Sequence, residues 1–291
     1  MFSDVNSDQK LNQKKWTIID LIKWSTEYLK SKNISNSIKE SEWFLSHIYK
    51  CNRLELYLKF DETVDESKLK IFKSFILRRL KHEPFQYIIN KAPFYGRDFY
   101  VDKNVLIPRP ETEIIIDILK NKKIKSVLDV GTGTGCLAIT LSLENITNYV
   151  LAIDKFENVI SVANKNSRHY KCYNIDFKKI NILESLPGEQ FDLVISNPPY
   201  IAKNELILLD QDVINYEPTT SLSDNKNGLL FFERFNEIYD YIVKPGGKLI
   251  LEFGGEKQID SLKKIFNSKI YNLFFYKDLN DMKRILKITK K

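Results

Sequence analysis

The residues best suited to chemistry are Asn197-Pro-Pro-Tyr200, which directly follow the apolar run Phe191–Ser196. The run has the character of a buried strand, and the prolines end it because they carry no N–H for a central ladder. Asn197 offers an amide oxygen, Pro198 a carbonyl and Tyr200 a flat ring. At the carboxyl end of a strand, where ligands bind in open α/β sheets, these groups suit a planar substrate that carries an NH2. The alternative is an ordinary proline-terminated strand with an asparagine cap.

A glycine-rich loop, Gly131-Thr-Gly-Thr-Gly135, follows the apolar stretch Val127–Val130. Cys136 stands where a dinucleotide-binding fingerprint needs its third glycine, and no lysine follows as in a P-loop. Asp154 ends the next expected strand about 20 residues later, where an acidic residue binds ribose hydroxyls; the alternative is a helix N-cap. A ribose without a pyrophosphate fits S-adenosylmethionine. Asp129 either orients the loop or meets the ammonium group of that cofactor.

These groups need a framework, and the alternation of strands and helices from Ile114 onward predicts an α/β fold with a doubly wound, mostly parallel sheet. The last two strands are joined too closely for a parallel crossover, so they should pair antiparallel. The expected strands are 126–130, 149–153, 173–177, 191–196, 248–253, 271–276 and 283–289, and the expected helices are 137–143, 159–167, 227–243 and 259–266.

The first part of the chain has a different pattern. Residues 1–15 are polar and are expected to be disordered. From Trp16 to about Leu80, glycine is absent and apolar residues recur at helical spacing, which predicts a small helical bundle over 16–84. Residues 85–110 alternate aromatic and polar residues and contain turn signals, which predicts a β-hairpin linker to a third part over 111–291.

Composition sets further limits on function. Hydrophobic residues make up 43% and charged residues 29%, as in a soluble globular protein, and no run approaches the roughly 18 apolar residues of a membrane span. With no signal-peptide pattern near Met1, we expect a cytoplasmic protein without membrane contact. The formal charge of +7 is spread along the chain, mostly as lysine, so it does not by itself indicate nucleic-acid binding. Three scattered cysteines and three scattered histidines predict neither a disulfide framework nor a metal site.

At this point the chain resembles the class I S-adenosylmethionine-dependent methyltransferases that modify a planar nitrogen, and more narrowly the release-factor glutamine N5-methyltransferases, a HemK/PrmC-like family. The resemblance runs from about residue 16 to the C-terminus and is carried by Gly131–Gly135, Asp154, Asn197-Pro-Pro-Tyr200, Lys244-Pro-Gly-Gly247, Glu83-Pro-Phe-Gln-Tyr-Ile88 and Leu106-Ile-Pro-Arg-Pro-Glu-Thr-Glu113. It implies a Rossmann-like seven-stranded sheet with an antiparallel C-terminal hairpin, a helical substrate-recognition domain and a β-hairpin linker.

The resemblance also implies a reaction: methyl transfer from S-adenosylmethionine to the glutamine amide in the Gly-Gly-Gln motif of class 1 peptide chain release factors. Asn197 and Pro198 would be catalytic, accepting the two N–H hydrogens of that amide. The substrate-binding residues would be Asn197, Pro198, Pro199 and Tyr200, and the cofactor-binding residues Gly131, Thr132, Gly133, Thr134, Gly135, Asp154, Ile182 and Asn197. We further expect a monomer that binds no specific nucleic acid directly.

The sequence departs from the family pattern at three places, of which Asn181-Ile182 matters most because the family usually has Asp near the adenine there. Two other functions stay open. One is a DNA or RNA adenine N6-methyltransferase, since adenine presents the same planar NH2 after base flipping. The other is a ribosome-associated factor that binds S-adenosylmethionine without catalysis.

Overall fold

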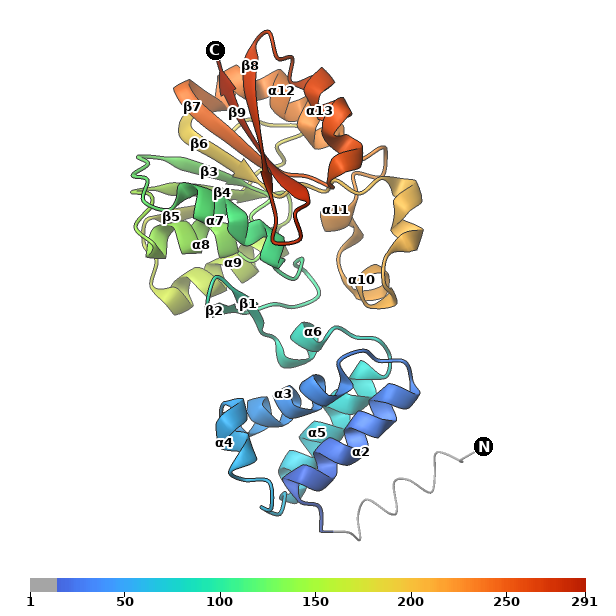
Figure 1. Ribbon diagram of the computed structural model, residues 1–291. Coiled ribbons are helices and arrows are strands. Elements are labelled where there is room, and N and C mark those ends of the chain that lie inside the picture. The colour runs from blue at the N-terminus through green and yellow to red at the C-terminus, as the bar shows by residue number, and fades with distance from the viewer. Residues whose placement is uncertain (1–14) are drawn as a thin grey trace. The chain divides into compact units, whose positions relative to one another are not determined.

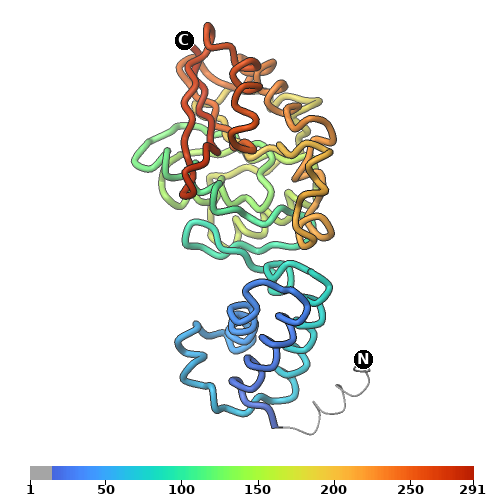
Figure 2. Tube along the Cα trace, turned by 45° about the vertical axis from the view of Figure 1, so that its right-hand side comes forward, coloured from blue at the N-terminus to red at the C-terminus, as the bar shows by residue number. Residues whose placement is uncertain are grey.

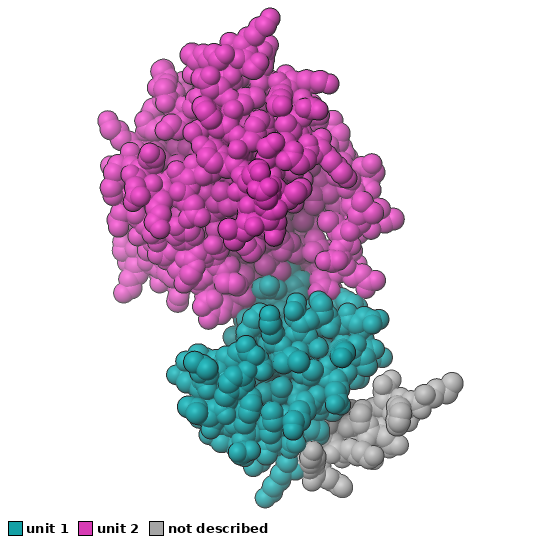
Figure 3. All heavy atoms as spheres, viewed as in Figure 1, with its two compact units in different colours: residues 1–89 teal, residues 90–291 magenta. Residues whose placement is uncertain are grey.

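The computed structural model describes residues 15–291, which form two compact units: the first ends at Ile89 and the second is Asn90–Lys291 (Figure 3). Each unit is described by itself below. Of the segment predicted to be disordered, all residues before Lys15 lie outside the described part of the chain. The first unit includes residues 85–89, which the sequence assigns to the linker.

The first unit is helical, as its glycine-free periodic sequence predicts. Thr17 opens the first described helix with a capping box: its side chain accepts from the Asp20 amide, and the Asp20 side chain accepts from the Thr17 amide. Buried apolar side chains such as Leu21, Phe44 and Phe72 join the helices in one core. The helices are α2 (Ile18–Ser31), α3 (Ser37–Tyr49), α4 (Arg53–Tyr57), α5 (Glu66–Arg79) and α6 (Phe85–Ile89).

A small antiparallel hairpin opens the second unit. Its strands are β1 (Ala92–Phe94) and β2 (Arg97–Phe99), and Tyr95 and Gly96 form the turn with positive φ. The hairpin is therefore shorter than the expected 85–110, because residues 85–89 are helical and residues 100–109 have no regular structure.

The second unit is built on a seven-stranded sheet in the order β5-β4-β3-β6-β7-β9-β8, which confirms the predicted α/β fold (Figure 1). The first five strands pair in parallel, and β9 pairs antiparallel with both β7 and β8. Figure 2 shows the last two strands running side by side at the end of the chain. The strands are β3 (Val127–Val130), β4 (Val150–Asp154), β5 (Ile175–Lys179), β6 (Phe191–Ser196), β7 (Val243–Glu252), β8 (Tyr271–Lys277) and β9 (Lys283–Lys290).

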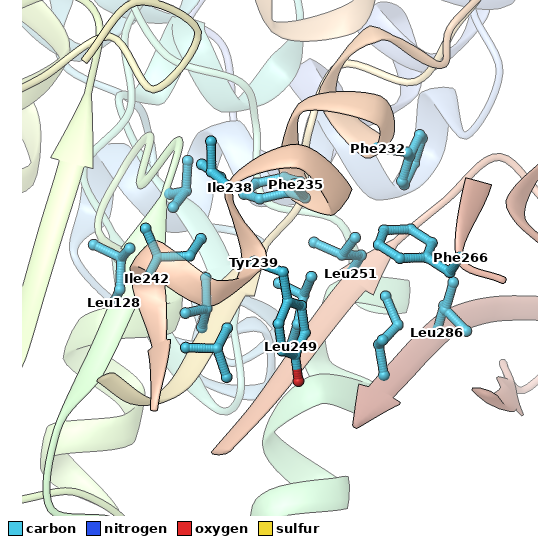
Figure 4. Packing of buried hydrophobic residues seen from close by; sticks show 14 of the residues in the cluster. Leu128, Phe232, Phe235, Ile238, Tyr239, Ile242, Leu249, Leu251, Phe266 and Leu286 are labelled. Atoms are coloured by element: carbon cyan, nitrogen blue, oxygen red, sulfur yellow. The ribbon is translucent and has the colours of Figure 1, made fainter. Parts of the chain in front are cut away.

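Helices cover both faces of this sheet, which explains why its central strands read as continuous apolar runs. Leu128 packs in one core with the helix Leu230–Ile242, as Figure 4 shows, whereas its neighbour Val127 packs in the other core with the helices Ile114–Leu119 and Cys136–Leu143. The helices of this unit are η1 (Pro110–Glu113), α7 (Ile114–Leu119), α8 (Cys136–Leu143), α9 (Glu157–Tyr170), η2 (Lys203–Leu208), α10 (Gln211–Tyr216), α11 (Thr219–Leu222), α12 (Leu230–Ile242), η3 (Glu256–Gln258) and α13 (Ile259–Ile265).

Two kinds of feature are absent from the described residues. Over 15–291 there is no helix with the length and apolar character needed to cross a membrane. Within the same residues, no group of three or more His, Cys, Asp or Glu side chains has an arrangement that could hold a metal ion.

Candidate active site

Three strand ends meet at one edge of the sheet and create the candidate site. In the parallel register Val130 of β3 lies between Ile153 of β4 and Ser196 of β6. The chain proceeds from β3 to β4 and β5 on one side, and returns to β6 on the other side of β3. Loops that leave such a reversal point diverge and open a crevice at the carboxyl ends of the strands.

A cleft lies at this reversal point, entirely within the second unit. Seven of the predicted site residues line it, and they come from the ends of β3, β4, β5 and β6: Gly131, Gly133, Asp154, Ile182, Asn197, Pro198 and Pro199. Its lining comprises Val105, Leu106, Val130, Gly131, Gly133, Asp154, Lys155, Phe156, Val159, Ile180, Asn181, Ile182, Leu183, Ser196, Asn197, Pro198, Pro199, Thr220, Ser221, Ser223, Asp224, Asn225, Leu230 and Phe231.

The glycine loop reaches the cleft through its backbone. Gly131 and Gly133 line the cleft, and both have the positive φ that non-glycine residues rarely adopt. Thr132 faces the interior, where its hydroxyl donates to the Asp129 carboxylate at 2.7 Å. Burial raises the pKa of Asp129 to about 7. Of the two roles considered for Asp129, the structure therefore favours orienting the loop.

The other two predicted loop residues support the loop from behind. The Thr134 carbonyl accepts a hydrogen bond from the buried Asn166 side chain at 2.9 Å. Gly135 has positive φ at the start of α8, and a Cβ there would lie 3.3 Å from Ala163 Cβ. Neither residue is among those that line the cleft within residues 15–291, and the same holds for Thr132. Direct cofactor contact by these three residues stays a prediction that the geometry does not favour.

Asp154 stands at the end of β4 and faces the cleft. Its two carboxylate oxygens accept from the backbone N–H groups of Gly133 and Phe156, each at 3.3 Å. Burial raises the pKa of Asp154 above its usual range. These two amides fix the carboxylate beside the glycine loop, which is the position needed to bind the hydroxyls of a ribose. It does not cap α9, because the N-cap residue of that helix is Phe156.

Asn197 enters the cleft directly after β6, and its side chain is held by a neighbour far away in sequence. The Asn197 Nδ2 group donates to the Thr112 hydroxyl at 3.1 Å, which leaves Oδ1 of this amide available to a ligand. The preceding residue, Ser196, donates its hydroxyl to the Val130 carbonyl at 2.8 Å and ties the strand end to β3. Pro198 and Pro199 continue the cleft wall.

Tyr200 is more enclosed than its predicted role requires. Its hydroxyl donates to the buried Glu252 carboxylate at 3.2 Å, and it is not among the cleft-lining residues of the described chain. Burial raises the pKa of the Tyr200 phenol. Stacking of Tyr200 on the substrate stays a prediction, whereas anchoring of the motif is what its contacts support.

The segment between β6 and α12 closes over this end of the cleft and supplies residues that sequence reasoning missed. Asp224 holds the turn before α12, because its carboxylate accepts from the Gly228 and Leu230 amides, each at 3.0 Å. Gly228 has φ of +77°, and a Cβ there would lie 2.2 Å from the Tyr200 carbonyl oxygen. The only sequence signal was the turn-forming run Ser223-Asp-Asn-Lys-Asn-Gly228, which by itself indicates a loop.

Arg109 forms an ion pair with Glu217 that joins two segments next to the cleft. The Arg109 guanidinium donates to Glu217 at 2.6 Å, and the other oxygen of that carboxylate accepts from the Ile107 amide at 3.2 Å. Glu217 directly follows α10. The pair therefore ties the segment that enters η1 to the segment between β6 and α12.

Chemically, the cleft joins two distinct sets of groups. One end presents glycine backbone and a carboxylate beside apolar side chains such as Ile182 and Phe156, which suits a nucleoside. The other end presents the Asn197 amide oxygen and the rigid proline backbone, which suits a planar NH2 group. Such an arrangement can hold a nucleoside cofactor and a planar nitrogen side by side.

Comparison with known families agrees with this description. A family model of the PrmC N-terminal domain matches residues 20–89, and a family model of the methyltransferase small domain matches residues 110–217. The second match contains the glycine loop, Asp154 and the Asn197-Pro-Pro-Tyr200 motif.

Individual relatives cover nearly all of the chain. A release factor glutamine methyltransferase of Geobacter sulfurreducens is 31% identical over 273 residues, which are 93% of this chain and 96% of the relative. A bifunctional methyltransferase of Rickettsia conorii is 32% identical over 93% of this chain, but the chain spans only 57% of that relative's length. Among solved structures, a methyltransferase from Pyrococcus furiosus shares the fold, with a TM-score of 0.53 at 17% identity over 74% of this chain and 96% of its own.

Proposed function

The chain belongs to the release factor glutamine methyltransferase family, and from this premise we propose that it methylates the side-chain amide nitrogen of the glutamine in the Gly-Gly-Gln motif of class 1 peptide chain release factors. The methyl donor of this enzyme is S-adenosylmethionine. The observation that carries the proposal is the cleft in which Asp154 and the glycine loop face Asn197 across one sheet edge.

The residues at the cofactor end fit S-adenosylmethionine. Asp154 is held by two backbone amides with its carboxylate toward the cleft, and the loop glycines let the backbone come close. Ile182 and Phe156 provide the apolar surface that an adenine ring requires. We therefore assign Gly131, Gly133, Asp154 and Ile182 to the cofactor. When bound, the cofactor supplies an electrophilic methyl group on a sulfonium centre.

At the substrate end the chain must activate a weak nucleophile. An amide nitrogen shares its lone pair with the carbonyl, so it attacks only when it is held in line and allowed to become pyramidal. Asn197 Oδ1 and the Pro198 carbonyl would accept the two N–H hydrogens, direct the remaining lone pair along the cleft and stabilise positive charge on the nitrogen. As the nitrogen gains the methyl group, one of these two hydrogens would leave as a proton to water. These contacts accelerate the reaction to the extent that they strengthen in the transition state.

The proposal also covers substrate recognition, cellular location and oligomeric state. We propose that the first unit recognises the release factor and that the enzyme acts in the cytoplasm, where translation takes place. We further propose that it works as a monomer and reads no nucleic-acid sequence itself. A labelling experiment can distinguish a release factor from a nucleic acid as the methyl acceptor.

The test is methyl transfer from labelled S-adenosylmethionine to three acceptors: a purified release factor, the same factor with its Gly-Gly-Gln glutamine changed to alanine, and unmethylated DNA. The expected result is label on the first acceptor alone. Label on DNA would instead favour adenine N6-methylation, and binding of the cofactor without any transfer would favour a non-catalytic factor.

Asn197→Ala should lower kcat roughly a hundredfold, by analogy with loss of one oxyanion-hole donor. Asn272→Ala is the matched control, because Asn272 is an exposed asparagine on β8 outside the cleft. Its turnover should equal that of the unmodified chain. Near-normal turnover of Asn197→Ala would refute the role assigned to this amide.

A further inference from the structure

Thr112 and Glu252 form a chain of hydrogen bonds behind the Asn197-Pro-Pro-Tyr200 motif. Neither residue has a role in the reaction as proposed above. We propose that Thr112 and Glu252 are positioning residues which fix the orientation of the Asn197 amide, so that its oxygen and not its NH2 group faces the methyl acceptor. This inference rests on the proposed function, since it concerns the same substrate end of the cleft.

The contacts run from the cleft into the interior. The Asn197 Nδ2 group donates to Thr112 Oγ1 at 3.1 Å, and Thr112 Oγ1 donates to Glu252 Oε2 at 2.6 Å. The second carboxylate oxygen, Oε1, accepts from the Tyr200 hydroxyl at 3.2 Å. Thr112 is 3% exposed and Glu252 is 1% exposed, so water does not compete for these bonds. One buried carboxylate thus holds both ends of the Asn197-Pro-Pro-Tyr200 motif.

The direction of each bond follows from the number of hydrogens available. An ionised carboxylate only accepts, so Thr112 must give its single hydroxyl hydrogen to Glu252. The Thr112 oxygen can then only accept from Asn197, and the side of the amide that faces it must be Nδ2. A flipped amide would place Oδ1 against a hydroxyl oxygen with no hydrogen between them, leaving two buried acceptors unpaired.

This orientation matters because the acceptor is itself an NH2 group. With Oδ1 toward the cleft, Asn197 accepts a hydrogen from the substrate nitrogen and stabilises the positive charge that grows there. With Nδ2 toward the cleft, it would present a donor to a donor. The distinction therefore affects the chemical step more than the binding of either substrate.

The charge state of Glu252 makes the orientation dependent on pH. Burial raises the pKa of Glu252 to about 7; nearby Glu111 also raises it, whereas Arg284 and the hydrogen bonds from Thr112 and Tyr200 lower it. Once protonated, the Glu252 carboxyl group can donate to the Thr112 oxygen. The Thr112 hydroxyl hydrogen is then free to donate to another acceptor. The Asn197 amide then no longer prefers the orientation that turns Oδ1 toward the cleft. We therefore expect kcat to fall as the pH decreases through about 7.

The experiment compares Thr112→Val, Thr112→Ser and Glu252→Gln in the full chain, with a release factor as acceptor. Thr112→Val keeps the shape and removes the hydroxyl. Its kcat should decrease about ten- to a hundredfold, as for a misplaced catalytic group, while the KM for the release factor and the Kd for S-adenosylmethionine stay within about twofold. Thr112→Ser keeps the hydroxyl and should recover most of the lost kcat.

The pH profile separates positioning from packing. Unmodified protein should show an acid limb in kcat near pH 7, and Glu252→Gln should have a low kcat without that limb. An unchanged kcat in Thr112→Val, an equal loss in Thr112→Ser, or an acid limb retained in Glu252→Gln would each overturn the inference. If Thr112→Val does not fold, the profiles of Thr112→Ser and Glu252→Gln decide. Failure of the proposed function looks different, because the unmodified protein would then leave the release factor unlabelled.

Discussion

The ion pair of Arg109 with Glu217 gives the sharpest test of how the cleft is held together. It joins the segment before η1 to the end of α10, and residues of both neighbouring segments line the cleft. Replacing Arg109 by methionine keeps much of the side-chain volume and removes the charge. The Glu217 carboxylate then stays buried, and among the described residues the Ile107 amide is the hydrogen-bond donor that it keeps.

The magnitude follows from the burial of the two partners. Breaking a fully buried ion pair costs about 3–5 kcal/mol, because the remaining charge has lost its partner. The Glu217 side chain is 1% exposed, but that of Arg109 is 31% exposed, and the Ile107 amide still serves the carboxylate. We therefore expect a loss of about 2–3 kcal/mol in the free energy of unfolding, below the buried-pair range. In a domain of this size that lowers Tm by roughly 4–12 °C.

The loss in the free energy of unfolding should also depend on pH. Burial raises the pKa of Glu217 in the folded protein, and Arg109 opposes that shift. Without Arg109 the folded pKa rises further, so the folded state binds a proton that the unfolded state has lost. Stability then falls as the pH rises through that window. The difference between Arg109→Met and the unmodified protein should therefore be larger at pH 8 than at pH 5.

The distribution of tryptophan supplies an internal control for this assay. All three tryptophans, Trp16, Trp24 and Trp43, lie in the first unit, so their fluorescence follows that unit only. Calorimetry should show the decrease in Tm of the second unit, while the fluorescence transition stays unchanged. Lys277→Met removes an exposed ion pair with Asp281 and should cost less than about 1 kcal/mol. The reasoning is refuted if Arg109→Met behaves like this control, or if its deficit is larger at pH 5 than at pH 8.

Two further predictions concern the cleft itself. Asp154→Ala should weaken S-adenosylmethionine binding about ten- to a hundredfold in calorimetric titration, because hydrogen bonds to a charged group contribute about 1.5–3 kcal/mol each; unchanged affinity would remove Asp154 from the cofactor site. Gly228→Ala should lower kcat more than tenfold, because the added Cβ would meet the Tyr200 carbonyl oxygen at 2.2 Å and shift the motif. A Gly188→Ala control shares the positive φ but meets no atom within 4 Å, so equal effects in both would point to backbone strain alone.

The strands of the sheet could be predicted because their apolar residues face a covered surface on both sides. Phe191–Ser196 has the predicted bounds, and the other predicted strands overlap the observed ones. The strand predicted to begin at Lys248 is the least accurate, since β7 begins at Val243. Val243, which pairs with Phe191, is followed by the polar, glycine-containing run Lys244-Pro-Gly-Gly247, and this run is typical of a turn.

The start of the linker could not be predicted from its pattern. The first three residues, Phe85-Gln-Tyr87, alternate aromatic and polar character, yet residues 85–89 form the short helix α6. In this helix the Tyr87 and Ile88 amides both donate to the Pro84 carbonyl. A proline that precedes a helix is favourable because its missing N–H is not needed there. A helix of five residues is too short for apolar periodicity to distinguish it from a strand, and packing of Ile88 into the helical core decides the outcome.

The most informative residue that the sequence reasoning passed over is Glu252, although a signal was present. It is a charged residue inside the apolar strand Lys248–Phe253, and such a residue is almost never fully buried unless it is paired. Asp129 in Val127–Val130 carries the same signal. Both carboxylates are 1% exposed, and burial raises the pKa of each to about 7.

The two carboxylates also act in the same way on different halves of the site. Asp129 holds the hydroxyl of Thr132 within the glycine loop, and Glu252 holds the hydroxyl of Thr112 behind Asn197. Their partners differ in sequence separation, three residues in one case and 140 in the other, so only the first pairing could be read from spacing. What the sequence can identify is therefore the buried carboxylate that needs a partner, and what the fold adds is the hydroxyl that donates to it.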